Sequence, residues 1–520
     1  MAASFSHFRL KARRRGLVLI IVLIVVVLLS LGAYSFSDLM LTHHESAQLS
    51  GTQLQTRLLV DSAVDFATAF FAQDQATRTD AGGVFDNPDM FRGRTVIEDE
   101  DPELRGSFTI LSPNLDDEGN LGGVRYGFED ESTRLNLSTI MTLENALPSS
   151  GKTLLMALPE MTEEIADAIL DWLDTDDDAR ELGAEIAYYS GLDPPYAPKN
   201  GPMETVEELL LVRGITPELL FGMDTNRNGM IDPHEMAGDG SAGQSTDAGE
   251  GERGWSAYLT LYSLEANVNA MGEKRVFLNG DDMTQLNTDL TAAGLDATWV
   301  TFIIGYRQNG PYTGTNQAQV GVTGELDLTK KGNTKITQLL DLIGAKIQVT
   351  FTGTSSPTVI ESPMSKEIGA MGLYLPVLMD KVTINEAATI PGRVNINQAS
   401  ATILKGIPGM TPDMITEILS RREYEPGDEK LNHRHETWIM AEAIVTLDEM
   451  RSLMPYICGG GDVYRAQVVG YFQGGQTASR AEVIFDASTP APRVLFWRDT
   501  SHLGRGYALE TLGVDFTETE

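Results

Sequence analysis

The stretch from Arg13 to Tyr34 reads RRRGLVLIIVLIVVVLLSLGAY and decides how the rest of the chain is arranged. The run from Leu17 to Tyr34 carries no charge over 18 residues, which reaches the length that an apolar helix needs to cross a bilayer. Five basic residues precede it, whereas acidic residues such as Asp38 and Glu45 follow it. The positive-inside rule therefore predicts one membrane-spanning helix with a cytoplasmic N-terminus and the bulk of the chain exported.

Three interpretations of this segment compete: an uncleaved signal anchor, a cleaved secretory signal peptide, and the leader of a pilin-like subunit. A signal peptidase requires a small-x-small site, for which Leu31-Gly32-Ala33 is a weak match. Gly16, directly before the apolar run, resembles the end of a prepilin leader, which predicts cleavage between Gly16 and Leu17. Most pilin-like proteins carry Glu at the fifth mature position, where this chain has Ile21.

The composition of the 520-residue chain limits the function classes. There are 74 acidic and 39 basic residues, and the formal net charge of −35 argues against nucleic-acid binding and favours solvated surfaces or divalent cations. The single cysteine, Cys458, excludes an internal disulfide framework and a multi-cysteine zinc site.

The pattern of the remaining chain predicts an α+β fold. Apolar residues at helical spacing extend the N-terminal helix to about Ala76. Short strands are expected at Ser107–Leu111 and Val124–Phe128, and further strands near the C-terminus at 463–472, 480–485 and 493–498. We therefore expect a long N-terminal helix and an antiparallel sheet drawn from both ends of the chain, interrupted by a large middle section.

An internal repeat marks the middle section. Leu158–Trp172 aligns without gaps to Ile407–Arg421, and Val212–Leu220 is a shorter echo. Each copy has a turn followed by a Thr that can cap a helix, which predicts helix-hairpin-helix units. Such turns can hold DNA phosphates, but the turn at Pro408–Thr411 lacks a second Gly and the chain is strongly acidic. A packing module is the favoured interpretation, and a membrane-anchored DNA-uptake protein is the alternative.

An EF-hand-like loop is the sharpest chemical motif. Ligand-type residues occupy loop positions one, three, five, seven, nine and twelve, and Gly229 occupies the sharp turn at six. The predicted calcium ligands are Asp224, Asn226, Asn228, the Met230 carbonyl, Asp232 and Glu235. Because Pro233 and a Gly-rich stretch shorten the exiting helix, we expect a structural ion rather than a sensor.

A second acidic loop repeats part of this spacing. Asp174, Asp176, Asp178 and Glu185 fall at positions one, three, five and twelve, but Ala179 stands where Gly is needed. Hard oxygen ligands favour calcium, and a charged surface loop is an equally weighted interpretation.

Enzyme motifs are scarce. None of the seven histidines lies in a metal-protease motif, and no nucleophile elbow or phosphate loop occurs. The stretch His433–Glu436 is interpreted as surface. We expect no catalytic site and no enzyme activity.

Several motifs together resemble the general secretion pathway protein K family, the minor pseudopilins of type II secretion. They are Asp130-Glu131 with Arg134–Leu137, Ala166–Asp174, Tyr188-Tyr189, Pro194–Asn200, Val206–Ile215 and Val394–Asn397. The resemblance covers nearly the whole chain except about 238–390. It implies a pilin-type helix and sheet, an inserted α-helical domain of helix-hairpin-helix or SAM-like type, and calcium near that domain.

The resemblance also implies partners and a location. We expect a tip complex with two other minor pseudopilins, contact with the inner-membrane secretion platform, and processing by prepilin peptidase. The protein is expected in the inner membrane, with one pass and a periplasmic bulk. Ile21 fits a tip subunit, because a buried Glu there would find no neighbouring N-terminal amine to pair with.

The predicted division of the chain follows from these patterns. It comprises a leader (1–16), an assembly helix (17–76), the first part of the sheet (77–133), the first part of the α-domain (134–237), a linker (238–254), a further α/β insertion of unknown role (255–391), the second part of the α-domain (392–457), and the second part of the sheet (458–520).

Overall fold

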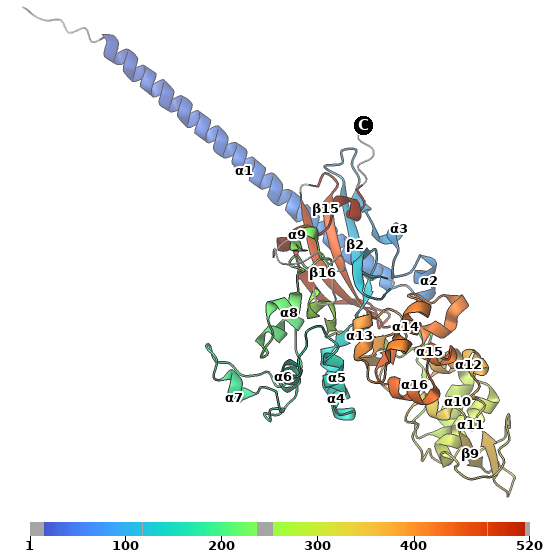
Figure 1. The fold of residues 1–520 in the computed structure, drawn as a ribbon. Coiled ribbons are helices and arrows are strands. Elements are labelled where there is room, and N and C mark those ends of the chain that lie inside the picture. Colours follow the sequence, from blue (N-terminus) through green and yellow to red (C-terminus); the bar gives the residue numbers. More distant parts are fainter. Residues whose placement is uncertain (1–14, 117, 237–252, 476, 515–520) are drawn as a thin grey trace, which may run out of the picture.

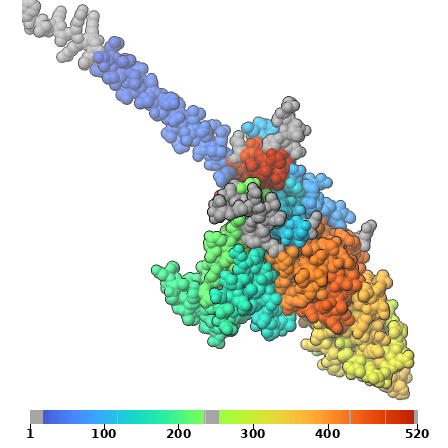
Figure 2. Space-filling model, in the orientation of Figure 1, coloured from blue at the N-terminus to red at the C-terminus, as the bar shows by residue number. Residues whose placement is uncertain are grey.

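The structure is a computed structural model that describes residues 15–116, 118–236, 253–475 and 477–514. The predicted leader (1–16) and linker (238–254) lie almost wholly outside these residues. Helix α1 (Arg15–Phe71) is long and apolar enough to cross a membrane, and its first half projects away from the rest of the protein (Figures 1 and 2). The predicted extension to Ala76 is wrong, because Asp74 accepts a hydrogen bond from Thr77 N (2.8 Å) and thereby caps a separate helix, α2 (Gln75–Asp80).

The second half of α1 packs on an antiparallel sheet whose strands come from both ends of the chain. The central order is β1 (Arg94–Ile97), β2 (Gly106–Leu115), β15 (Val463–Phe472), β16 (Ala478–Asp486) and β17 (Arg493–Asp499). Strand β3 (Leu121–Arg125) pairs with β2, and β4 (Glu129–Asp130) pairs with β15. Strands from both ends of the chain thus lie side by side, as the alternating patterns indicate (Figure 1).

One predicted strand has the wrong boundaries. Expected at Val124–Phe128, it ends at Arg125, and the next residues turn away from the ladder. There Asn87 N donates to Tyr126 O (2.7 Å) and Phe128 N donates to Val84 O (2.9 Å). The backbone therefore pairs with the loop that precedes α3 (Pro88–Phe91) instead.

Apolar side chains on α1 form the core beneath the sheet. Val60, Ala63, Ala67 and Phe70 are buried against β2, β15 and β16. The backbones of α1 and β15 lie very close together at Gly470, where an added Cβ would lie 2.4 Å from the Thr56 carbonyl oxygen. The helix backbone therefore rests directly on β15.

The regular secondary structure between the two parts of the sheet is mostly helical in the described residues. Its helices are α4 (Leu137–Ala146), α5 (Ser150–Leu155), α6 (Glu163–Leu173), α7 (Ile186–Tyr189), α8 (Pro217–Phe221), α9 (Pro233–Met236), α10 (Met283–Ala292), α11 (Ala297–Asn309), α12 (Ile368–Lys381), α13 (Ala401–Gly406), α14 (Pro412–Arg421), α15 (Trp438–Ala441) and α16 (Leu447–Leu453). A hairpin, β9 (Lys346–Val349) with β10 (Thr358–Glu361), lies beside α11. Short strand pairs join distant segments: β5 (Leu135–Asn136) with β6 (Leu259–Thr260), β7 (Leu264–Ala266) with β12 (Thr389–Pro391), β8 (Val276–Phe277) with β11 (Val382–Thr383), and β13 (Val394–Asn395) with β14 (Ile457–Cys458).

The two full copies of the repeat form equivalent helix pairs. The hydroxyls of Thr162 and Thr411 each accept a hydrogen bond (3.3 Å) from the backbone N–H three residues later in the chain. They therefore cap α6 and α14. The turn residue before the cap is left-handed in both copies, Gly409 with φ of 88° and Glu160 with φ of 57°. The first helices of the two pairs, α5 and α13, pack against each other.

One hydrophobic core runs through the whole inserted section. It includes Leu135 at one end and Ile457 at the other, together with residues of the 255–391 region such as Leu278 and Phe302. The segments predicted as separate units therefore share a core, although their predicted boundaries stay predictions.

Candidate metal sites and the junction with the sheet

Three carboxylates converge where α6 ends and α7 begins. One oxygen from each of Asp171, Asp174 and Glu185 lies within 4.8 Å of the others. Asp171 is three residues before Asp174, the C-terminal cap of α6, so that both face the same side of the helix. Gly183 passes so close to Asp171 that an added Cβ would meet its carboxylate.

This group differs from the predicted ligand set. Asp174 and Glu185 belong to it, whereas Asp176 and Asp178 are exposed and lie outside the group. The physical reason is that α6 persists to Leu173, which places Asp171 and Asp174 at its end, whereas Asp176 and Asp178 lie in the exposed segment that follows. Asp171 was missed, although its spacing from Asp174 at a helix end was a usable signal.

The electrostatics of the group favour a cation. Glu185 is 4% exposed, and neither of its carboxylate oxygens has a hydrogen-bond partner. Burial, followed by repulsion from Asp171 and Asp174, raises the pKa of Glu185 to about 7. Arg180 Nη1 contacts Asp171 (2.6 Å) and Asp174 (2.5 Å). The group of three carboxyl side chains is therefore paired with one positive charge. The donor set fits a hard divalent cation such as calcium.

The EF-hand-like loop adopts the predicted turn. Asp224 accepts hydrogen bonds from Asn228 N (3.0 Å) and Gly229 N (2.8 Å), and Gly229 has a φ of 79°. Burial raises the pKa of Asp224 to about 6. Helix α9 begins at Pro233, inside the loop, and the residues after Met236 lie outside the described ranges.

The remaining acidic ligands of this loop bond to its own amides. Glu235 accepts from Thr225 N (2.9 Å), Asn226 N (3.1 Å) and Asp232 N (2.9 Å), and Asp232 accepts from the side chains of Asn226 and Asn228. Burial would raise the pKa of Glu235, but these hydrogen bonds outweigh it and lower the pKa. The amide oxygen of Asn226 is buried without a partner. Cation binding here therefore requires the carboxylates to exchange amide donors for the ion.

The loop also holds the inserted section against the sheet domain. Tyr507 Oη donates to Asn228 O (2.7 Å), the Asn228 amide donates to Gly506 O (2.5 Å), and Arg480 donates to Asn226 O. Met230 packs against the core that contains Leu111 and Tyr507. The spacing of the loop residues gave no indication of this contact.

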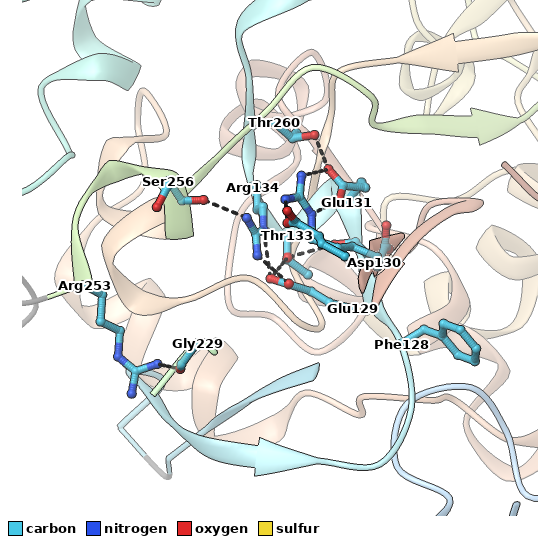
Figure 3. Close-up of polar contacts among 12 residues, drawn as sticks. Phe128, Glu129, Asp130, Glu131, Thr133, Arg134, Gly229, Arg253, Ser256 and Thr260 are labelled. Carbon is cyan, nitrogen blue, oxygen red and sulfur yellow. Dashed lines mark hydrogen bonds and ion pairs between the residues drawn. The ribbon is translucent and has the colours of Figure 1, made fainter. Parts of the chain in front are cut away.

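A buried network joins the two parts of the protein near Arg134 (Figure 3). Arg134 donates to Glu129 through Nε (3.0 Å) and Nη2 (2.6 Å), and to Ser256 O through Nη1 (2.8 Å). Glu131 accepts from Arg465 on β15 and from the Thr260 hydroxyl. Each carboxylate therefore links the sheet to the start of the inserted section.

The prediction that His433–Glu436 lies at the surface is wrong. His433 is 2% exposed, stacks on Trp438 with ring centroids 4.2 Å apart, and contacts Glu442 through Nε2 (2.8 Å). Glu436 is buried and paired with Arg393 (2.9 Å). Burial lowers the pKa of His435 to about 4, which leaves its ring neutral at pH 7.

The structure combines a long apolar helix, an antiparallel sheet on which this helix rests, and a helical section inserted between the strands, an arrangement consistent with a pilin-like fold. Residues 133–223 match the family model described as type II secretion system (T2SS), protein K. The chain is 46% identical over 57 residues to type II secretion system protein K of Aeromonas hydrophila, a match covering 11% of this chain and 17% of that protein. Part of this chain therefore resembles type II secretion system protein K, and the stretch aligned to the Aeromonas hydrophila protein spans less than a fifth of that protein's length.

A solved structure is also similar. It is a chain in the crystal structure of the GspK-GspI-GspJ complex from the enterotoxigenic Escherichia coli type 2 secretion system. The alignment covers 88% of this chain and 99% of that chain, with 10% identity and a TM-score of 0.38. The resemblance to protein K rests on the sequence matches.

Proposed function

We propose that the chain is a minor pseudopilin at the tip of a type II secretion pseudopilus, with a structural role in protein export. The match of residues 133–223 to the protein K family carries this proposal. Helix α1 supports it, because its first half is apolar and exposed along its length, as a helix that packs among lipids or other subunits must be.

The position at the tip is supported by Ile21. An acidic side chain inside the bilayer is costly unless it is paired. A subunit with no neighbour above it has no N-terminal amine to supply the pair, so an apolar residue is the favourable choice. The expected partners are two other minor pseudopilins, the inner-membrane platform and prepilin peptidase. The Escherichia coli relative is named as part of a complex with GspI and GspJ.

We assign calcium as the ion of this protein, in a structural role. Asp171, Asp174 and Glu185 would hold it at the end of α6, where unpaired buried carboxylate oxygens support the assignment. The loop from Asp224 to Glu235 is the second proposed site, supported by its ligand spacing. An assembly role needs no catalytic residue, and no observation favours the DNA-uptake alternative.

The N-terminus of the mature protein tests the pseudopilin proposal. Mass spectrometry of the protein purified from membranes should show a chain that starts at Leu17. The same measurement on a Gly16→Ala variant should show the unprocessed chain. A start at any other residue in the unmodified protein would contradict the pilin-type assembly helix.

A further inference from the structure

A polar cleft of about 420 Å³ lies where three parts of the chain meet. One wall is α2 and the loop that follows it, a second is the segment around β7, and a third is formed by residues 424–436 and 459–462. Hydrogen bonds hold these walls together: Val84 N donates to Glu425 (2.6 Å), and Ala266 N donates to Asp462 (2.8 Å). The cleft is thus a feature of the packed fold, distant in sequence from both proposed calcium sites.

The carboxylates that line the cleft already have donors. Glu265 and Glu436 share Arg393, with contacts of 2.6 Å and 2.9 Å. Asp130 accepts from Ser132 N, Gly461 N and the Asn395 amide. Asp380 accepts from Ala270 N (2.7 Å). Because these carboxylates are already hydrogen-bonded or paired, an added cation would gain little from binding in the cleft.

Two guanidinium groups in the cleft have no such partner. The guanidinium groups of Arg78 on α2 and Arg275 in the inserted region form no hydrogen bond or ion pair with any residue that the structure describes, and that of Arg78 lies 5.9 Å from the centre of the Phe71 ring. Nε and Nη1 of Arg78 and Nε of Arg275 are buried and unpaired. Burial lowers the pKa of Arg275, despite the nearby charges of Glu436 and Glu265. Leaving such donors unsatisfied inside a protein is costly, and an anionic acceptor removes the cost.

The charge of the cleft restricts the anion. Six carboxyl groups and four arginines line it, and His435 is neutral at pH 7. A highly charged anion would be repelled by the surplus of carboxylates, whereas one carboxylate accepts up to four hydrogen bonds and matches the planar guanidinium. A neutral or basic remainder on the ligand would complement the acidic rim.

We propose that this cleft binds a carboxylate group, between Arg78 and Arg275, carried by a molecule whose remainder is neutral or basic. An acidic side chain of a partner polypeptide and a free amino acid share this chemistry. Because Arg78 belongs to the pilin-like part and Arg275 to the inserted region, the bound carboxylate bridges the two.

The test uses the full chain in detergent micelles and three probes: a fluorescent Lys-Glu-Lys peptide, the matched Lys-Gln-Lys peptide, and free glutamate as competitor. Saturable binding of the Glu peptide, at least tenfold tighter than that of the Gln peptide, is expected. Displacement by millimolar glutamate identifies the free amino acid as a sufficient ligand, and lack of displacement assigns the site to a polypeptide. Equal binding of the two peptides, or no binding of either, overturns the proposal.

Substitutions locate the site. Arg78→Gln and Arg275→Gln should each weaken binding of the Glu peptide at least tenfold, and Arg78→Lys should weaken it less than Arg78→Gln. The matched control is Arg421→Gln, which removes an exposed guanidinium paired with Glu417 on α14. Binding that is unchanged in both cleft variants would place the carboxylate elsewhere and refute the assignment.

Discussion

Glu185 is a buried carboxyl group without a hydrogen-bond partner on either oxygen. Its pKa of about 7 lies above its usual value of 4.5, so burial destabilises the charged form in the folded chain. In the absence of a cation, protonation of Glu185 contributes to the free energy of unfolding. This contribution is fully present below about pH 4.5 and is lost as the pH rises through 7. A bound divalent cation reverses this loss, because it stabilises the carboxylate.

Calcium is therefore expected to raise the melting temperature more at pH 8 than at pH 5. A concentration 100 times the Kd adds about 2.7 kcal/mol to the free energy of unfolding. Glu185→Gln should remove most of the response, and Glu181→Gln, an exposed change in the same loop, should retain it. Any remaining response should disappear when Asp224 and Glu235 are also replaced by their amides. Identical melting temperatures with calcium and with a chelator would refute both sites.

The buried pair of Arg134 and Glu129 makes a second residue-scale prediction. Arg134→Met leaves Glu129 charged and buried without its partner, which should lower the free energy of unfolding by about 3–5 kcal/mol. Combining Arg134→Met with Glu129→Leu should restore most of that loss, since the unpaired charge is gone. Urea unfolding followed by tryptophan fluorescence measures both, and equal losses in the single and double variants would contradict the role of the pair.

At the scale of elements, the contact between α1 and β15 depends on Gly470. A methyl group there would meet the backbone of the helix at Thr56 and Val60, which cannot move without separating from the sheet. Gly470→Ala should therefore cost about 1–3 kcal/mol of unfolding free energy. Gly427→Ala, at an exposed position with no atom within 4 Å of the added Cβ, is the control and should change stability little. Equal melting temperatures for the two variants would show that the helix is not held closely at Gly470.

The elements with strong periodicity could be predicted from the sequence, and those set by tertiary contacts could not. Alternation identified β15, β16 and β17, and the Thr caps of the repeat identified α6 and α14. The end of α1 at Phe71 was missed because no Gly or Pro follows it before Asp74, which caps a new helix. The sequence spacing grouped Asp174 and Glu185 with Asp176 and Asp178, but it could not show that these two residues lie in the exposed segment after α6, outside the carboxylate group that Asp171 joins.

At the scale of the whole molecule, residues far apart in the sequence make the cleft and the docking contacts of the calcium loop, and this limits what spacing can reveal. Arg78 and Arg275 line one cleft because the inserted section packs beside α2. The Asp224–Glu235 loop contacts Tyr507 because the C-terminal segment returns to the sheet. Motif analysis could find the loop, but neither its docking partner nor the cleft has a local signal.

The shared core and sheet predict that the chain stays together when it is cut between its two halves. Residues on both sides of the 237–252 segment form one hydrophobic core, and β2 from the first half pairs with β15 from the second. A protease site inserted between Gln244 and Ser245 should therefore give two fragments that co-elute with the uncut protein in detergent. The fragments should separate only in urea, because separation exposes the core and breaks the β2–β15 ladder. Dissociation in native buffer would mean that the two halves fold as independent units, contrary to the continuous core that runs from Leu135 to Ile457.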